Sequence, residues 1–237
     1  MPDRRAGPAP ARPLRGPVRV YLEQGSRWVF ACALEWPGWC RRGRSEELAL
    51  ESLTAYMPRY GAVASRAGLA FPAGGAGQAV RFAVTERLTS PFGADFGAPC
   101  EIPRSDATPV GAAAAQRMAA LASAAWEVFD EVAGAAPAQL RKGPRGGGRD
   151  RDKIIDHVLG ADAAYARKLG VRHRQPAAGD TAAVAALRAD VRAVLASPSD
   201  GIPPVPKGWP ARYAARRIAW HALDHAWEIE DRSGPGG

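Results

Sequence analysis

The chain has 237 residues, 46% of them hydrophobic, which is enough to bury a core and excludes a wholly disordered protein. It has no run of about 18 uncharged apolar residues and no apolar signal-peptide region, so we expect a cytoplasmic protein without a membrane partner. The formal net charge is +8, but residues 1–16 and 141–153 together hold nearly all of it. A broad basic face is therefore not expected, which argues against nucleic acid as a partner.

The N-terminal region begins with a segment rich in Pro, Arg and Gly. Residues 1–16 show no apolar period, and we predict a disordered tail. Alternating β-forming residues then predict a hairpin with strands at 18–22 and 27–34, followed by a short strand at 39–40. The three cysteines of the chain are an odd number without close spacing, which indicates reduced thiols rather than a disulfide framework.

A helix and a further strand follow the hairpin. The Ser45 hydroxyl can cap a helix that continues to about Met57, where Pro58 kinks or ends it. A strand is predicted at 79–84. The resulting β-β-β-α-β order predicts an α+β domain over residues 17–88.

This domain resembles the HicB-like antitoxin domain. The resemblance is carried by the hairpin, the Trp-Pro-Gly-Trp-Cys corner at 36–40, Gly43, and the helix start Ser-Glu-Glu-Leu-Ala-Leu-Glu at 45–51. It implies a role in recognition of a partner. The DNA-binding element that usually accompanies such domains is not recognisable, so a general binding or dimerisation module, with a homodimer as one assembly, stays an alternative.

A linker is predicted at residues 89–108, which are rich in Pro, Gly and Asp, and a second disordered tail at 233–237. Three apolar residues of the linker are available to pack on the neighbouring domains: Phe92, Phe96 and Ile102.

Four amphipathic helices are predicted after the linker. Apolar residues from Met118 to Val132 step by three and four, and three later segments show the same period. Asp150 or Asp152 can cap the second helix and Asp180 the third. Four such helices in sequence predict an all-α four-helix bundle over residues 109–232.

Three of the four histidines lie on inward faces of these helices. His221 and His225 are four residues apart, so both can bind one ion, and His157 is a third candidate ligand from the second helix. Glu228 shares their face as a fourth ligand or as an acceptor that orients an imidazole, and Arg217 is placed to hold an anionic group of a substrate. The alternative is three packed, hydrogen-bonded histidines without an ion.

The bundle resembles the DinB/YfiT-like superfamily. The resemblance is carried by residues 153–162 and 212–229, which contain the three histidines. It implies a four-helix bundle with a divalent metal held by His157 on the second helix and by His221 and His225 on the fourth. Zinc is the expected ion, and nickel is the alternative.

A basic, glycine-rich loop precedes the second helix. Lys142, Arg145 and Arg149, with backbone N–H groups at a helix start, suit a carboxylate or a phosphate of a substrate. A solvated loop without a ligand is the alternative.

The resemblance also implies a reaction class. Characterised members of the superfamily include S-transferases and isomerases that use low-molecular-weight thiols such as mycothiol or bacillithiol. We therefore expect a metal-dependent S-transferase, or a related hydrolase or isomerase, with a small thiol and an electrophile as partners. Two alternatives stay open: a non-catalytic, metal-containing binding protein of HicB–DinB architecture, and a nucleic-acid-associated stress protein. The sequence identifies no catalytic residue beyond the ligands.

Overall fold

The structure is a computed structural model that describes residues 16–72, 80–143 and 147–233. The two tails predicted to be disordered lie outside these residues, apart from Gly16 and Ser233. Ser233 is the last residue of a helix, so the second tail was predicted to begin one residue too early. Arg145, one of the predicted anion contacts, also lies outside the described residues.

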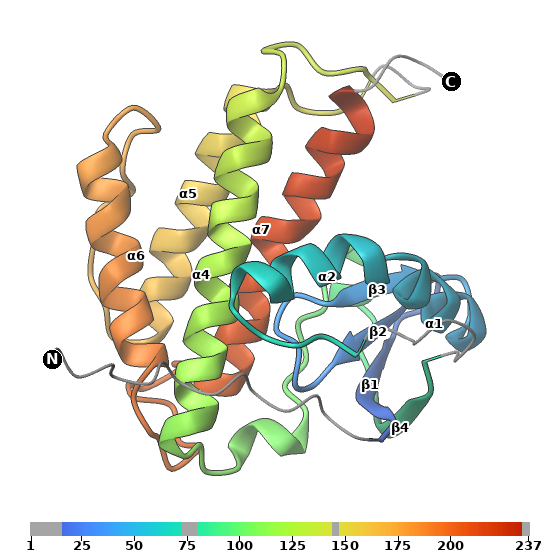
Figure 1. Ribbon diagram of the computed structural model, residues 1–237. Helices are drawn as coiled ribbons and strands as arrows, with labels where there is room; N and C mark the ends of the chain where they lie inside the picture. Colours follow the sequence, from blue (N-terminus) through green and yellow to red (C-terminus); the bar gives the residue numbers. More distant parts are fainter. Residues whose placement is uncertain (1–15, 73–79, 144–146, 234–237) are drawn as a thin grey trace, which may run out of the picture.

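The protein has an α+β fold, as predicted, with one mixed four-stranded sheet in the order β3-β2-β1-β4 (Figure 1). The strands are β1 (Val18–Gln24), β2 (Val29–Ala33), β3 (Cys40–Gly43) and β4 (Phe82–Thr89). The β1–β2 hairpin is antiparallel, as is β2–β3, whereas β4 runs parallel to β1.

The fourth strand was predicted at 79–84 but spans Phe82–Thr89. Its bounds are set by pairing with β1 and not by the apolar residues of its own sequence. It pairs with the whole of β1, from Val18 opposite Phe82 to Gln24 opposite Thr89. Its later residues alternate between half-buried and exposed, which an edge strand with one solvated face permits.

Two helices follow β3: α1 (Glu46–Ala55) and α2 (Met57–Arg66). Ser45 caps α1 as predicted, with its hydroxyl accepting from the Leu48 N–H. The chain breaks at Tyr56, because Pro58 lacks the N–H that a continuous helix would use. We call the sheet together with α1 and α2 the α+β unit.

The segment predicted as a linker is fixed to the sheet by carboxylates. It contains α3 (Gly93–Phe96) and a 3-10 helix, η1 (Arg104–Ala107). The Asp95 carboxylate accepts from the N–H groups of Ser26, Arg27 and Trp28, while buried Glu23 accepts from those of Cys100 and Glu101.

The three apolar residues of this segment that were available to pack are exposed. Phe92 and Phe96 are 88% and 92% exposed, and Ile102 is 42% exposed. The segment is held instead by the polar contacts of Asp95 and Glu23, which leave these three side chains exposed.

Four long helices, which we call the helical half, form the rest of the molecule. They are α4 (Ala112–Ala135), α5 (Arg151–Lys168), α6 (Thr181–Leu195) and α7 (Ala211–Ser233). They pack side by side, with α4 against α7 and α6, and α5 against α6 and α7 (Figure 1). None of the helices in the described ranges is both long and apolar enough to cross a membrane.

The predicted helix caps differ in outcome. Asp180 caps α6 by accepting from the Ala183 N–H. Asp150 flanks α5, but its carboxylate accepts from the Leu140 N–H and from Lys142 instead of capping the helix. Asp150 therefore occupies the predicted N-cap position, but its side chain bonds the returning loop and not the first turn of the helix.

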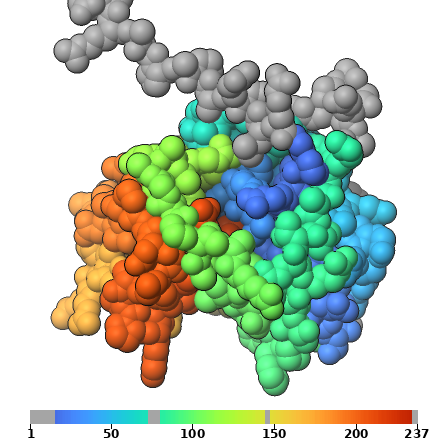
Figure 2. Space-filling view, turned by 90° about the horizontal axis from the view of Figure 1, so that it is seen from below, coloured from blue at the N-terminus to red at the C-terminus, as the bar shows by residue number. Residues whose placement is uncertain are grey.

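The α+β unit packs directly on the helical half. One hydrophobic core continues from Trp39 and Tyr60 to Phe129 and Trp227, and α2 lies against α4. Figure 2 shows the segment between β4 and α4 (green) lying between the α+β unit (blue) and the last helices (orange to red). One side of α7 therefore faces the sheet, which decides what surrounds the histidines.

A buried carboxylate in the helical half gives a prediction about pH. Asp162 accepts from Trp126 Nε1 at 3.1 Å, and its second oxygen lies 3.5 Å from Arg188 Nε. Burial raises the pKa of Asp162 to about 6, although Arg188 and Trp126 oppose the rise. In the unfolded chain the Asp162 carboxyl has its ordinary pKa of about 3.9. The folded state therefore loses stability as the pH rises from about 3.9 to about 6, where the folded protein still holds the proton that the unfolded chain has released.

We therefore expect the free energy of unfolding of the wild type, relative to that of Asp162→Asn, to fall by about 2 kcal/mol between pH 4 and pH 7. Chemical denaturation across that range measures it. Asp152→Asn, on the exposed start of the same helix, is the control. Parallel profiles for the wild type and Asp162→Asn would contradict the assignment.

Candidate metal centre

The structure brings His157, His221 and His225 together. His157 comes from α5, and the other two lie one turn apart on α7. The ring centroids are 4.7 to 5.0 Å apart, and one nitrogen of each ring lies within 4.8 Å of the others. The Nε2 atoms of His157 and His221 are 3.2 Å apart.

The environment favours the neutral form of two of these imidazoles, those of His157 and His221. His221 is 7% exposed, and the other two are half-buried. Burial, together with the neighbouring His225 and His157, lowers the pKa of His221 well below its ordinary value. Burial also lowers the pKa of His157. Neutral imidazoles each keep a lone pair for a ligand bond, as a metal site requires.

The distance between two of the ring nitrogens fits a divalent ion. Two imidazole nitrogens bound tetrahedrally to zinc at about 2.0–2.1 Å lie roughly 3.3 Å from each other. The 3.2 Å between the Nε2 atoms of His157 and His221 matches that separation. Three protein ligands also leave a coordination position for water or a substrate, as in catalytic zinc sites.

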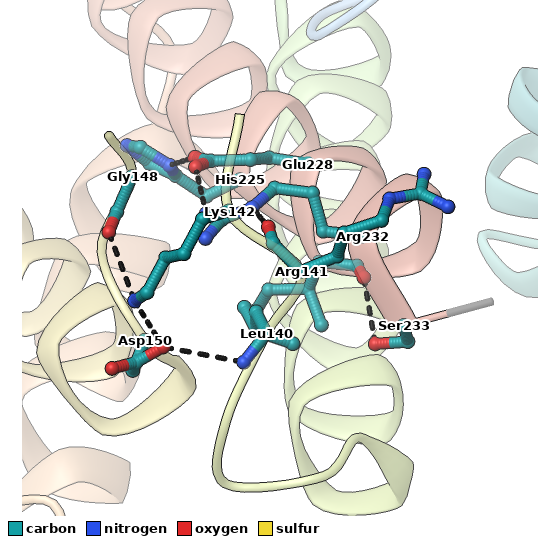
Figure 3. A network of polar contacts seen from close by, with 10 residues as sticks. Leu140, Arg141, Lys142, Gly148, Asp150, His225, Glu228, Arg232 and Ser233 are labelled. Carbon is teal, nitrogen blue, oxygen red and sulfur yellow. Dashed lines mark hydrogen bonds and ion pairs between the residues drawn. The ribbon is translucent and has the colours of Figure 1, made fainter. Parts of the chain in front are cut away.

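Glu228 contacts the His225 ring and is not a ligand of an ion placed among the three rings. Its Oε2 lies 2.8 Å from His225 Nδ1, and its Oε1 accepts from Arg232 at 2.7 Å (Figure 3). Burial alone would raise the pKa of Glu228, but these two contacts outweigh it and lower the pKa. Glu228 was predicted as a fourth ligand or as a hydrogen-bond acceptor that orients an imidazole. The structure favours the acceptor role, in which Glu228 holds the His225 ring by Nδ1 and leaves its Nε2 for a metal ion.

Arg217 lies beside the cluster but is partly engaged. Its Nη1 donates to the Pro99 carbonyl at 2.7 Å, and its guanidinium lies 4.6 Å from the Trp220 ring centroid. It also lies 5.7 Å from the ring of Tyr165, which itself packs on His221. Within the described residues, the other donors of Arg217 form no hydrogen bond, which leaves them for an anion beside the cluster.

Of the basic-loop residues predicted to contact an anion, Arg149 lies near the histidine cluster. Arg149 is exposed, and its charge contributes to the lowered pKa values of His157 and His221, so it lies within electrostatic reach of the cluster. Lys142 is instead held by Asp150 and the Gly148 carbonyl (Figure 3). Its predicted contact with a substrate is therefore not supported.

Two residues of the site were missed in the sequence. Tyr165 reads as one more apolar position of α5, and its contact with His221 depends on how α5 meets α7. Arg232 was detectable, because it lies four residues after Glu228, the spacing of an ion pair along a helix.

A second group of potential ligands comprises Glu23, Cys100 and Glu101. Both oxygens of Glu23 already accept backbone N–H groups, from Cys100 at 2.7 Å and from Glu101 at 3.1 Å. These bonds explain why a carboxylate is buried here, so the histidine cluster is the stronger candidate.

Fold and site together define an α+β protein with a three-histidine candidate metal centre between two long helices. Comparisons of the chain with family models, with curated proteins and with solved structures found no match.

Proposed function

We propose that the chain is a metal-dependent enzyme of the DinB/YfiT-like type, with α4 to α7 as its four-helix bundle. In this proposal residues 17–88 are a HicB-like domain, 89–108 a linker and 109–232 the bundle. The observation that carries the metal site is the convergence of three imidazoles, two of them with Nε2 atoms 3.2 Å apart. Zinc is the proposed ion and nickel the alternative. The reduced cysteines favour a cytoplasmic location.

The proposed reaction is transfer of a small thiol, such as mycothiol or bacillithiol, to an electrophile. A bound divalent ion with an open position supplies Lewis acidity that favours the thiolate form of a thiol. Glu228 holds His225 in one tautomer and orientation. Arg217 and Arg149 attract an anionic group of the thiol or of the electrophile.

The proposal is tested by conjugation assays on zinc-loaded protein, with several small thiols and monobromobimane as the electrophile. We expect turnover that requires zinc, that is lost in His221→Ala and that is kept in His173→Ala. His173 lies outside the cluster and pairs with Asp190. Zinc binding without turnover of any thiol would favour the alternative, a non-catalytic metal-containing binding protein.

The role of Glu228 gives a second prediction. Glu228→Gln keeps the shape of the side chain but loses the charge that fixes His225, so we expect zinc affinity to fall about 10- to 100-fold. Competition with a chromophoric chelator measures it. Glu230→Gln is the matched control, because Glu230 lies on the same helix and faces Arg59 rather than the histidines. Equal affinities in both variants would assign Glu228 a role in helix packing alone.

A further inference from the structure

Two cysteines lie directly opposite each other on neighbouring strands. Cys32 of β2 and Cys40 of β3 form one antiparallel pair of the sheet. The Ala33 N–H donates to the Trp39 carbonyl at 3.0 Å, which makes the adjacent pair a hydrogen-bonded one. Because such pairs alternate, Cys32 and Cys40 occupy a non-hydrogen-bonded pair, where Cα atoms are about 4.5 Å apart and side chains are closest.

This position suits a covalent bond between the two sulfurs. Disulfides form between residues whose Cα atoms are about 4.4–6.8 Å apart. The two Sγ atoms are 2.8 Å apart, and both cysteines are free thiols in this structure. Bond formation therefore needs little movement of either strand.

The pair is enclosed by one side of the sheet and by α7, with an opening at Cys40. Cys32 and Cys40 pack with Phe30 and Trp220, and they are 2% and 5% exposed. Cys40 also lines a cavity of about 260 Å³ between β3 and α7. A small reagent can therefore reach Cys40, whereas a protein thiol of another molecule cannot.

We propose that Cys32 and Cys40 are a site of reversible oxidation, which a peroxide converts into a disulfide between β2 and β3. The Cys40 thiolate attacks one peroxide oxygen, giving a sulfenic acid and releasing hydroxide from hydrogen peroxide. The Cys32 sulfur then displaces the sulfenic hydroxyl, which leaves as water once the Cys32 proton has been transferred to it. The cysteines lose two electrons, and the peroxide gains them.

The surroundings of the two cysteines determine how fast they are oxidised and how the disulfide affects stability. Burial, together with Cys32, raises the pKa of Cys40, so few molecules carry the thiolate and oxidation is slow. The bond closes a short loop that contains Trp36 and Trp39, and it forms beside Trp220. Because it restricts the unfolded chain, the disulfide stabilises the fold. The inference does not depend on a metal at the histidines.

The full chain with Cys100→Ser provides the test, because the exposed Cys100 would otherwise react first. Hydrogen peroxide is expected to remove the mass of two hydrogen atoms, and dithiothreitol to restore it. Trypsin leaves both cysteines between Arg27 and Arg41, so chymotryptic cleavage after Leu34 and Trp39 is needed to separate them. The two fragments should then stay joined until they are reduced.

A thermal shift and single variants complete the test. Oxidation should raise the Tm of the Cys100→Ser protein by about 5 °C, and the rise should disappear when Cys32 or Cys40 is also replaced by alanine. The mass measurement needs only the Cys100→Ser protein, so it is independent of whether those variants fold. Fragments that separate without reductant, or sulfinic acid on Cys40 as the only product, would overturn the proposal.

Discussion

His221→Ala is expected to lower bound zinc from about one ion per chain to less than about a tenth of that. His221 is the most buried of the three histidines and lies next to both others, with ring centroids 5.0 Å from His157 and 4.7 Å from His225. Without it, the two remaining imidazoles come from different helices and bind zinc only as a weak pair. Elemental analysis of protein dialysed against a weak chelator measures the loss.

His173→Ala is the matched control, because it removes a histidine of the same chain outside the cluster. It should keep the full zinc content. Circular dichroism should show intact helices in both variants, since alanine favours a helix at position 221. Unchanged zinc in folded His221→Ala, or equal loss in both variants, would show that the three histidines are not the site.

The proximity of His225 to His221 was predictable, because it depends on local periodicity. Residues four apart on a helix share a face, which placed His225 beside His221. The inward stripe of α5 directed His157 toward the same interior. The Ser45 and Asp180 caps were predictable for the same reason, since a cap acts within one helical turn.

Contacts between distant segments were not predictable. The choice of Pro99 as the acceptor for Arg217 depends on how Asp95 and Glu23 hold the segment before α4. The approach of Cys32 to Cys40 depends on strand register, which the turn at 34–39 sets.

The contacts between α7 and the sheet were likewise not predictable from the sequence. Arg41 of β3 pairs with Asp224 at 3.0 Å, and its guanidinium lies 3.9 Å from the Tyr56 ring centroid. Nothing in the local sequence of either partner indicates the other, because they are far apart in the chain. The sequence therefore predicted which face of each long helix is buried, but not that the sheet would cover one side of the helix carrying two of the histidines.

Asp106→Ala is expected to have the largest effect on stability, about 3–5 kcal/mol. Asp106 of η1 is 0% exposed and pairs with Arg216 of α7, which is also buried. Burial alone would lower the pKa of Arg216, but the Asp106 carboxylate outweighs it and raises the pKa, so Arg216 stays charged. Without Asp106, that buried charge has no counterion, and the Tm should fall on the order of 10 °C.

Two comparisons identify the cause of this loss. Glu35→Ala breaks a more exposed ion pair with Arg19 and should cost less than about 1 kcal/mol. Asp106→Leu combined with Arg216→Met should recover most of the stability, because apolar residues can replace a buried ion pair at little cost. If the double variant is as unstable as Asp106→Ala, the loss comes from packing of η1 and not from the charge. Neither Asp106 nor Arg216 is among the residues of the described ranges that contact the histidine rings, so zinc content well below the lowered Tm should stay near about one ion per chain.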